Sequence, residues 1–380
     1  EISACLVGSE MCIRDRSILF ATLLSVTMTM AQQPATSSQA LYKELQDLQK
    51  KRLPTQTLSC AERLATQALR EGNLNYTIEA LEAHKTALFR LDYNRLLEQF
   101  PLLHTTWQGR NRFSERDQRF LALYIAREYI VKSSDWSFSS EGLSLTTQEQ
   151  DNFTPRYWSE ADYMKAIDPL LEIAFAPSAE LYKVIPRQEA EQLPDALYAD
   201  RLPKEGNYTL ISHLLKALPI SQLQQLEQKL GRTPTWSARI GALLTEDQLQ
   251  QADEGARLYA LYQAVTLEET TRGTASSTVA KRLEGLLQQS QQMHLETMEI
   301  YKRLFHYYYS EEDSTNPLRA YHFITPYLEW LDKQGKYPEF CKGIRRQLFT
   351  PQENISLTSF ILADHQGMVK MKPVSYTHLR

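Results

Sequence analysis

Apolar side chains recur along most of this chain at the three- and four-residue spacing of an α-helix. One continuous stripe runs from Leu58 to Leu69, and a longer one runs from Val279 to Tyr309. This period places apolar residues on one face of a helix, whereas a half-buried strand would alternate at every second residue. Glycine, which turn-rich folds and nucleotide-binding loops use freely, supplies only 13 of 380 residues. We therefore expect a mostly helical protein.

The charge balance argues against one class of binding partner. Lysine and arginine number 42 against 46 acidic residues, which gives a net charge of -4. A weakly acidic chain has no basic field to attract a polyphosphate, so we expect no nucleic-acid partner. The hydrophobic content of 42% is that of a globular protein rather than a disordered one.

A short apolar segment near the N-terminus has the pattern of an export signal. Residues 17–31 are apolar or small, Arg14 and Arg16 precede them, and Thr29-Met30-Ala31 places small residues where a signal peptidase reads. The segment is shorter than the roughly 20 apolar residues of a membrane-spanning helix. We expect a signal peptide cleaved after Ala31. The protein is then exported to the periplasm, cell envelope or exterior of a Gram-negative bacterium, and touches the membrane only through this segment before cleavage.

Both ends of the chain have unusual sequences. Residues 1–16 contain CLVGSEMCIRDR, and the chain closes with PVSYTHLR. Both strings resemble translated sequencing-adapter DNA, so we expect residues 1–16 and 374–380 to be non-native. The alternative is a natural start at Met11, which would make MCIRDR the basic segment of the signal peptide. Once the non-native ends are set aside, Cys60 and Cys341 remain. We expect two separate buried thiols, with a disulfide as the alternative in an oxidising compartment.

The interior divides by pattern into segments of different kinds. Residues 41–132 predict helical hairpins, because Pro54 can open a second helix after a first one and Gly72-Asn73 is a helix-stop signal before a third. Residues 158–350 predict a helical domain in which Ser159 is an N-cap. Its expected helices cover 158–175, 208–218, 255–267, 279–309, 318–331 and 340–348. Residues 181–203 are expected to be irregular or to form short helices. The remaining expected segments are a linker at 32–40 and a polar loop at 133–157.

The spacing of apolar residues changes from helical to strand-like after residue 350. Ile355 and Leu357 alternate with polar neighbours, a turn-like Asp364-His365-Gln366-Gly367 follows, and Met368 to Met371 alternates again. A lone hairpin is marginal in water. We therefore expect residues 351–373 to be the first strands of a truncated β domain.

The sequence contains no catalytic motif of the zinc-protease, serine-hydrolase or nucleotide-binding kinds, and no CxxC pair. Glu160, Asp162 and Asp168 flank one expected helix, but surface helices commonly carry such acids. We expect no catalytic residue, cofactor or metal. The histidines are scattered, with His294 and His306 expected on one long helix, and are interpreted as ordinary polar residues: His84, His104, His213, His294, His306, His322 and His365.

The aromatic residues allow two interpretations. They could line a groove that binds sugar or peptide, or they could pack between helices with their polar atoms at the surface, which we favour. The residues concerned are Trp107, Trp136, Trp158, Trp236, Trp330 and the run His306-Tyr307-Tyr308-Tyr309.

Short helices joined by Gly-Asn turns, with alanine where helices cross, are tetratricopeptide-like. We find no 34-residue period repeated three times, so we expect an irregular helical array of all-α class.

Several stretches together resemble one family. The segment from Leu41 to Leu88, with its Lys51-Arg52-Leu53-Pro54 turn, resembles the start of the exported alpha-2-macroglobulin-like proteins of Bacteroidota-type bacteria. WSEADYMKAIDPLLEIAF (158–175) and NYTLISHLLKAL (207–218) are similar to later helices of the same region, although Asn207 replaces the usual proline. The resemblance covers most of 41–372.

The resemblance implies a large envelope protein that traps proteases after cleavage of a bait segment. Its β-sandwich domains would begin near Ile355. Some members carry a Cys-Gly-Glu-Gln thioester, which does not occur in this sequence. The resemblance therefore implies a non-catalytic helical platform whose partners are proteases, through missing parts of the protein, and envelope proteins. Two alternatives remain: a free-standing tetratricopeptide-like binding or scaffold module, and an unrecognised α-helical enzyme.

Overall fold

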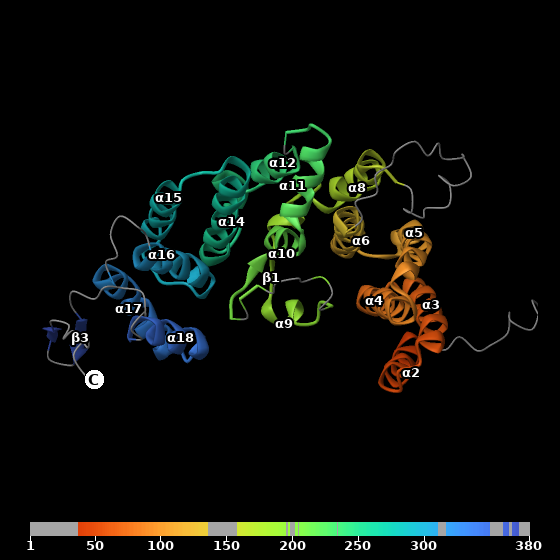
Figure 1. Ribbon diagram of the computed structural model, residues 1–380, viewed down its shortest axis with the longest axis horizontal. Coiled ribbons are helices and arrows are strands. Elements are labelled where there is room, and N and C mark those ends of the chain that lie inside the picture. The colour runs from red at the N-terminus through yellow and green to blue at the C-terminus, as the bar shows by residue number, and fades with distance from the viewer. Residues whose placement is uncertain are drawn as a thin grey trace, which may run out of the picture. The chain divides into compact units, whose positions relative to one another are not determined.

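The computed structural model describes most of the chain after the expected signal peptide, and its described residues form two compact units that divide between Ser114 and Glu115. Helices make up most of both units (Figure 1), which confirms the all-α class. A repeat architecture of tetratricopeptide type remains a prediction. The described residues are 37–135, 158–194, 197, 202–203, 205–233, 235–310, 317–349, 360–364 and 367–371.

The first unit begins with the three helices expected from the sequence. Its elements in order are α2 (Ser38–Lys50), α3 (Pro54–Glu71), α4 (Leu74–Leu91), η2 (Tyr93–Glu98), α5 (Gln99–Gln108) and η3 (Arg110–Arg112). The expected linker at 32–40 is wrong at its end, because Ser37 accepts the N–H of Ala40 and starts α2 at residue 38. Residues 32–36 lie outside the described part.

The turn between α3 and α4 requires a glycine. Gly72 has φ 67°, a left-handed conformation that closes a helix at little cost only without a Cβ. A Cβ there would lie 2.8 Å from the carbonyl oxygen of Arg112. The next residue, Asn73, accepts the N–H of Tyr76 and caps α4. A two-residue signal in the sequence thus ends one helix and begins the next.

Small side chains form the core of this unit. Ala61, Ala65 and Ala68 of α3 are buried against Ala80 and Ala83 of α4 and neighbouring leucines. Because alanine lets two helix backbones approach closely, these positions set the tight pairing of α3 with α4.

The second unit is built around α6. Its first elements are α6 (Glu115–Asp135), α8 (Glu160–Ala174), η5 (Ala179–Tyr182), β1 (Val184–Ile185), α9 (Arg187–Ala190), β2 (Tyr208–Thr209), α10 (Leu210–Ala217) and α11 (Ile220–Lys229). Residues around most of the circumference of α6 are buried, and α6 contacts α8, α10 and α11. A helix buried on most sides belongs to a core.

This burial changes two expected boundaries. We had placed residues up to 132 with the N-terminal hairpins, whereas α6 lies with the second unit. We had also started the polar loop 133–157 at Ser133, but α6 continues to Asp135 because Ser133 is buried with the rest of the helix. Residues 136–157 lie outside the described part.

The start and end of α8 are both fixed by side chains. Ser159 and Asp162 form a reciprocal capping box at the start, as the sequence predicted. At the end, the buried guanidinium of Arg119 donates to the carbonyl oxygens of Ala174 (3.1 Å) and Ala176 (2.8 Å). Arg119 therefore joins the core helix α6 to the end of α8.

A two-residue ladder interrupts the helices. β1 pairs with β2 in antiparallel register, Val184 opposite Thr209 and Ile185 opposite Tyr208. We had expected a helix from Tyr208 to Leu218. The helix starts at Leu210 instead, because the hydroxyl of Thr209 accepts the N–H of Ser212 as an N-cap and leaves the preceding residues extended.

The rest of the unit is a succession of helices. It contains α12 (Thr235–Leu243), α13 (Glu246–Leu249), α14 (Glu254–Arg272), α15 (Ser276–Gln288), η7 (Leu295–Thr297), α16 (Met298–Ser310), α17 (Pro317–Gln334) and α18 (Pro338–Phe349). From α14 to α18, each α-helix contacts the next one along the chain.

The expected single helix from Val279 to Tyr309 is wrong. It is two helices, α15 and α16, that pack against each other. The apolar spacing is interrupted by the polar residues 288–292. There the hydroxyl of Ser290 hydrogen-bonds to the backbone of Gln292, and the helix does not continue. His294 therefore precedes the short η7, and His306 lies on α16.

Two strands follow α18, as the sequence predicted. β3 (Phe360–Asp364) pairs with β4 (Gly367–Met371) in antiparallel register, Phe360 opposite Met371. The expected strand residues 354–359 and the turn residues 365–366 lie outside the described part. Membership of a macroglobulin-type sandwich remains a prediction.

Cys60 and Cys341 are buried and free, and burial raises the pKa of each thiol to about 11. Within the described ranges, no helix is both long and apolar enough to cross a membrane. The expected signal peptide and both expected non-native ends lie outside those ranges.

Candidate functional site

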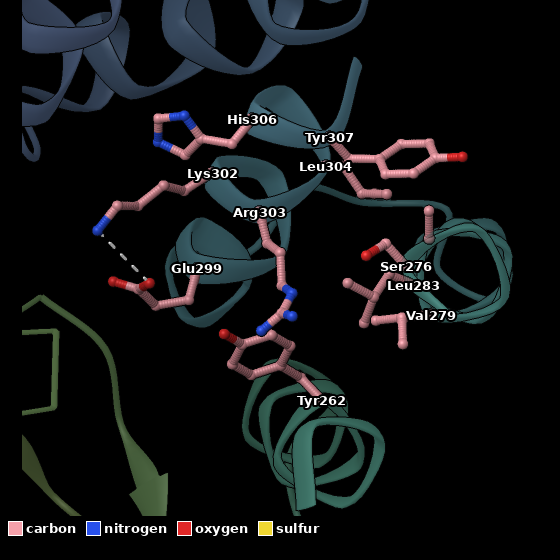
Figure 2. Close-up of a pocket in the computed structure, with 11 residues that line it drawn as sticks. Tyr262, Ser276, Val279, Leu283, Glu299, Lys302, Arg303, Leu304, His306 and Tyr307 are labelled. Carbon is pink, nitrogen blue, oxygen red and sulfur yellow. Dashed lines mark ion pairs between the residues drawn. The ribbon is translucent and has the colours of Figure 1, made fainter. Parts of the chain in front are cut away.

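The second unit has a groove between α14, α15 and α16. It has a volume of about 430 Å³, and its lining includes Tyr262, Val279, Leu283, Arg303 and Tyr307. In Figure 2, Arg303 reaches from α16 toward the ring of Tyr262 on α14, while Val279 and Leu283 face the same space from α15. The groove exists because α15 and α16 are separate helices.

One wall of the groove is apolar. Val279, Ala280 and Leu283 lie on one face of α15, at the helical spacing seen in the sequence. Leu304 of α16 closes the space from the other side and is fully buried. This wall can accept an apolar side chain but supplies no reactive group.

The charges at the groove are balanced within the fold. Arg303 makes two hydrogen bonds to the carboxylate of Glu269, at 2.7 and 2.6 Å. Lys302 lies 3.8 Å from the carboxylate of Glu299, the ion pair drawn in Figure 2. Since each cation already has an acidic neighbour, the groove presents no net positive field to an anionic ligand.

Two polar side chains of the groove, Tyr262 and His306, are held in their neutral forms. Burial raises the pKa of the Tyr262 phenol. Burial, followed by the charge of Lys302, lowers the pKa of His306. The groove therefore offers a neutral phenol, a neutral imidazole and charges already paired within the fold, all beside an apolar wall. This arrangement suits side-chain contact more than proton transfer.

The histidines considered from the sequence do not converge. His84 is buried on α4 beside Glu62, and His213 is buried on α10, where burial lowers its pKa to about 3. Over the described ranges, no three His, Cys, Asp or Glu side chains are grouped as they would be around a metal ion. The positions of the others are His104 on α5, His294 before η7, His306 on α16 and His322 on α17, while His365 lies outside the described residues.

Two of the acids weighed as possible catalysts, Asp162 and Asp168, have structural partners. Glu160 and Asp162 lie in the first turn of α8, where Asp162 completes the capping box. Asp168 accepts the indole N–H of Trp236 at 2.8 Å and lies 3.6 Å from Arg232. These contacts hold helix ends and side chains in place.

The tryptophans mostly pack against other rings or cations. Trp158 stacks on Tyr129 with 5.4 Å between ring centroids, and Trp330 stacks on Tyr327 at 5.7 Å. The guanidinium of Arg110 lies 4.3 Å from the ring of Trp107, and that of Arg239 lies 4.2 Å from the ring of Trp236. Trp107 lies on α5, a helix the sequence did not predict, and Trp136 lies outside the described residues.

The residues His306-Tyr307-Tyr308-Tyr309 all lie on α16, but their side chains face different surroundings. Tyr307 lines the groove, whereas Tyr308 is buried and bonds to Glu284. The hydroxyl of Tyr309 donates to the carbonyl oxygen of Gln347 on α18 at 3.0 Å. Sequence reasoning singled out this run but not Tyr262 or Arg303, whose position at the groove depends on how α14 meets α16.

The comparisons with known proteins found no match to this chain. No protein-family model matches the chain, and no curated protein and no solved structure is significantly similar to it.

Proposed function

We propose that this chain is the non-catalytic N-terminal helical platform of an exported alpha-2-macroglobulin-like protease inhibitor. In this role it positions the β domains that trap the protease, and it docks envelope partners. The proposal rests on the resemblance of the segments around 41–88, 158–175 and 207–218 to that family.

The observation that carries the proposal is the order of structure along the chain. A long succession of helices ends with α18, and the antiparallel hairpin β3–β4 follows it. Two strands alone are marginal in water and gain stability when further strands or a helix cover them. A hairpin in this place is what the first strands of a β-sandwich would look like.

The groove supports a contact role more than a catalytic one. Its cations are paired with acids of the same fold, and its wall is apolar. An enzyme site would instead bring together groups whose pKa values suit proton transfer at the working pH.

Sequencing the gene beyond the codon for Lys372 tests the proposal directly. We expect an open reading frame that continues into strand-rich domains with a cleavable bait segment. A stop codon immediately after the hairpin would overturn the inhibitor assignment.

An inhibition assay tests whether the helical part alone inhibits a protease. We expect residues 32–373 alone to leave the activity of an endoprotease on a large protein substrate unchanged, and the full natural protein to reduce it. Activity on a small peptide substrate serves as the control, because a trapped protease still cleaves small molecules. Inhibition by the helical chain alone would contradict a platform role.

The groove also gives some support to a second candidate, a free-standing binding module of tetratricopeptide-like kind. Tyr262 and Tyr307 line a groove between helices, as such a module would use to hold a peptide. The same gene sequence separates the two candidates, since a free-standing module predicts the early stop.

A further inference from the structure

Glu205 joins two parts of the second unit that are distant in sequence. Its Oε2 atom accepts from Arg187 Nη1 at 2.5 Å and from Lys336 Nζ at 2.8 Å. Its backbone N–H donates to the hydroxyl of Tyr337 at 3.0 Å. One residue thus holds both Lys336 and Tyr337, which form the turn between α17 and α18.

That turn has a strained backbone. Tyr337 has φ 50°, a left-handed conformation that is unfavourable for a residue with a Cβ, and Gly335, two residues earlier, has φ 65°. Such a conformation persists only where surrounding contacts impose it, and it is often found at hinges and switches. Here the contacts with Glu205 are among those that hold the turn from outside its own hairpin, and Tyr208 also interacts with Tyr337.

The segment around Glu205 is itself fixed to the body of the unit. The backbone N–H of Asn207 donates to Glu296 at 2.7 Å, and the side chain of Asn207 accepts the N–H of Arg187 at 3.0 Å. Tyr208 pairs in the β1–β2 ladder and packs on Tyr259 of α14. Glu205 therefore connects the α17–α18 turn to an anchored element.

The helix beyond the turn, α18, is held by contacts with α17 and α16. Cys341 and Ile344 of α18 are buried, Arg345 pairs with Asp332 of α17, and Gln347 accepts from Tyr309. Since each helix from α14 to α18 packs on the next, a small change at one turn moves everything after it. A contact that skips several helices, such as that of Glu205, restricts this motion.

We propose that Glu205 is a clasp that holds the strained α17–α18 turn closed, so that the turn is the hinge about which α18 can move. Removal of the carboxylate charge releases the turn while the helices on either side stay folded.

Hydrogen exchange on the whole chain tests the clasp with a matched pair of variants. Glu205→Gln removes the charge that holds Arg187 and Lys336, whereas Glu191→Gln removes the other, more exposed acid that pairs with Arg187. A third variant, Tyr337→Phe, removes the hydroxyl that accepts from Glu205. Three amides report on the turn: that of residue 205 itself, that of Lys336, which donates to Leu331, and that of Cys341, which donates to Tyr337.

We expect these three amides to exchange about tenfold faster in Glu205→Gln and in Tyr337→Phe than in the parent protein. Amides of α14 and α16 should be unaffected, and Glu191→Gln should behave as the parent. The proposal is overturned if the three amides keep their parent rates in Glu205→Gln, or if Glu191→Gln accelerates them equally. Uniform acceleration through α14 and α16 would also overturn it, since Glu205 would then support the fold rather than clasp one turn.

Discussion

The indole N–H of Trp236 donates to the carboxylate of Asp168 at 2.8 Å, which joins α12 to α8. As sequence features, the tryptophan was a candidate for ligand stacking and the aspartate a candidate acid. In the structure each satisfies the other's polar atom, and Trp236 is buried.

Loss of this acceptor should destabilise the protein. Asp168→Ala leaves the indole N–H without a partner, and we expect the free energy of unfolding to fall by about 1–2 kcal/mol. Asp168→Asn, which keeps an acceptor, should cost less. Glu172→Ala on the same helix is the control, because Glu172 is exposed and makes only a 3.5 Å contact with Arg239. Urea denaturation followed by tryptophan fluorescence measures all three, and equal effects of Asp168→Ala and Glu172→Ala would contradict the assignment.

Glu227 should make stability depend on pH. It is buried, accepts the N–H groups of Thr235 and Trp236 at the start of α12, and burial raises its pKa. The folded protein therefore holds a proton on Glu227 more readily than the unfolded chain does. Its contribution is most favourable at low pH and is lost as pH rises through the raised pKa.

Two substitutions separate the charge of Glu227 from its capping role. Glu227→Gln keeps an acceptor for the helix start without titrating, so its stability relative to the parent should rise between pH 4 and pH 7. Glu227→Ala loses the cap and should be about 1 kcal/mol less stable than Glu227→Gln at both pH values. Thermal unfolding at the two pH values checks this, and a constant difference between Glu227→Gln and the parent would argue against the pKa shift.

His213 should have the opposite pH dependence. Burial lowers its pKa from 6.5 to about 3, so below pH 6.5 the unfolded chain takes up a proton that the folded protein refuses. Stability from this residue is complete above pH 6.5 and should fall by about 1.4 kcal/mol per pH unit toward pH 3. Between pH 6.5 and pH 5 the loss is about 2 kcal/mol. Denaturation at these pH values should show a shallower loss in His213→Leu, whereas His322→Leu, at an exposed site, should keep the parent slope.

Two glycines in helices should respond oppositely to alanine. A Cβ at Gly255 would lie 2.4 Å from the carboxylate of Glu296, the same side chain that holds the N–H of Asn207. Gly255→Ala should therefore lower the free energy of unfolding by about 1–3 kcal/mol. Gly285 has no atom within 4 Å of a built Cβ, so Gly285→Ala should raise it by about 0.5–1 kcal/mol through helix propensity. Thermal denaturation of both variants decides the matter, and stabilisation by both would mean that Glu296 moves aside freely.

Elements whose limits are set by neighbouring residues could be predicted from sequence. Pro54, Gly72 and Ser159 act within one or two turns of themselves, and the helices they bound lie where those residues indicate. The apolar period also placed the helical faces correctly in α3 and α4. The apolar spacing predicted one helix from Val279 to Tyr309 where there are two. Polar side chains and the local bonds of Ser290 end the first helix, but the apolar spacing continues on either side, so the break does not show in the pattern.

The sites could be predicted far less well. Arg303 meets Tyr262 and Glu269, and Glu205 meets Lys336, only because helices far apart in sequence are brought together. No spacing along the chain encodes these distances. Asp162, Asp168 and the described tryptophans take part in capping, hydrogen bonds, ring stacking and cation contacts.

The amino-acid sequence by itself determined the helical class, several helix ends and the change to strands after α18, since propensity, capping and period act over a few residues. Only the tertiary structure decided that α6 is a core helix of the second unit, that α15 and α16 fold back on each other to form the groove, and that Glu205 holds the α17–α18 turn. Those features depend on which apolar surfaces pack against each other and so leave water. Such packing between distant segments is a property of the whole fold.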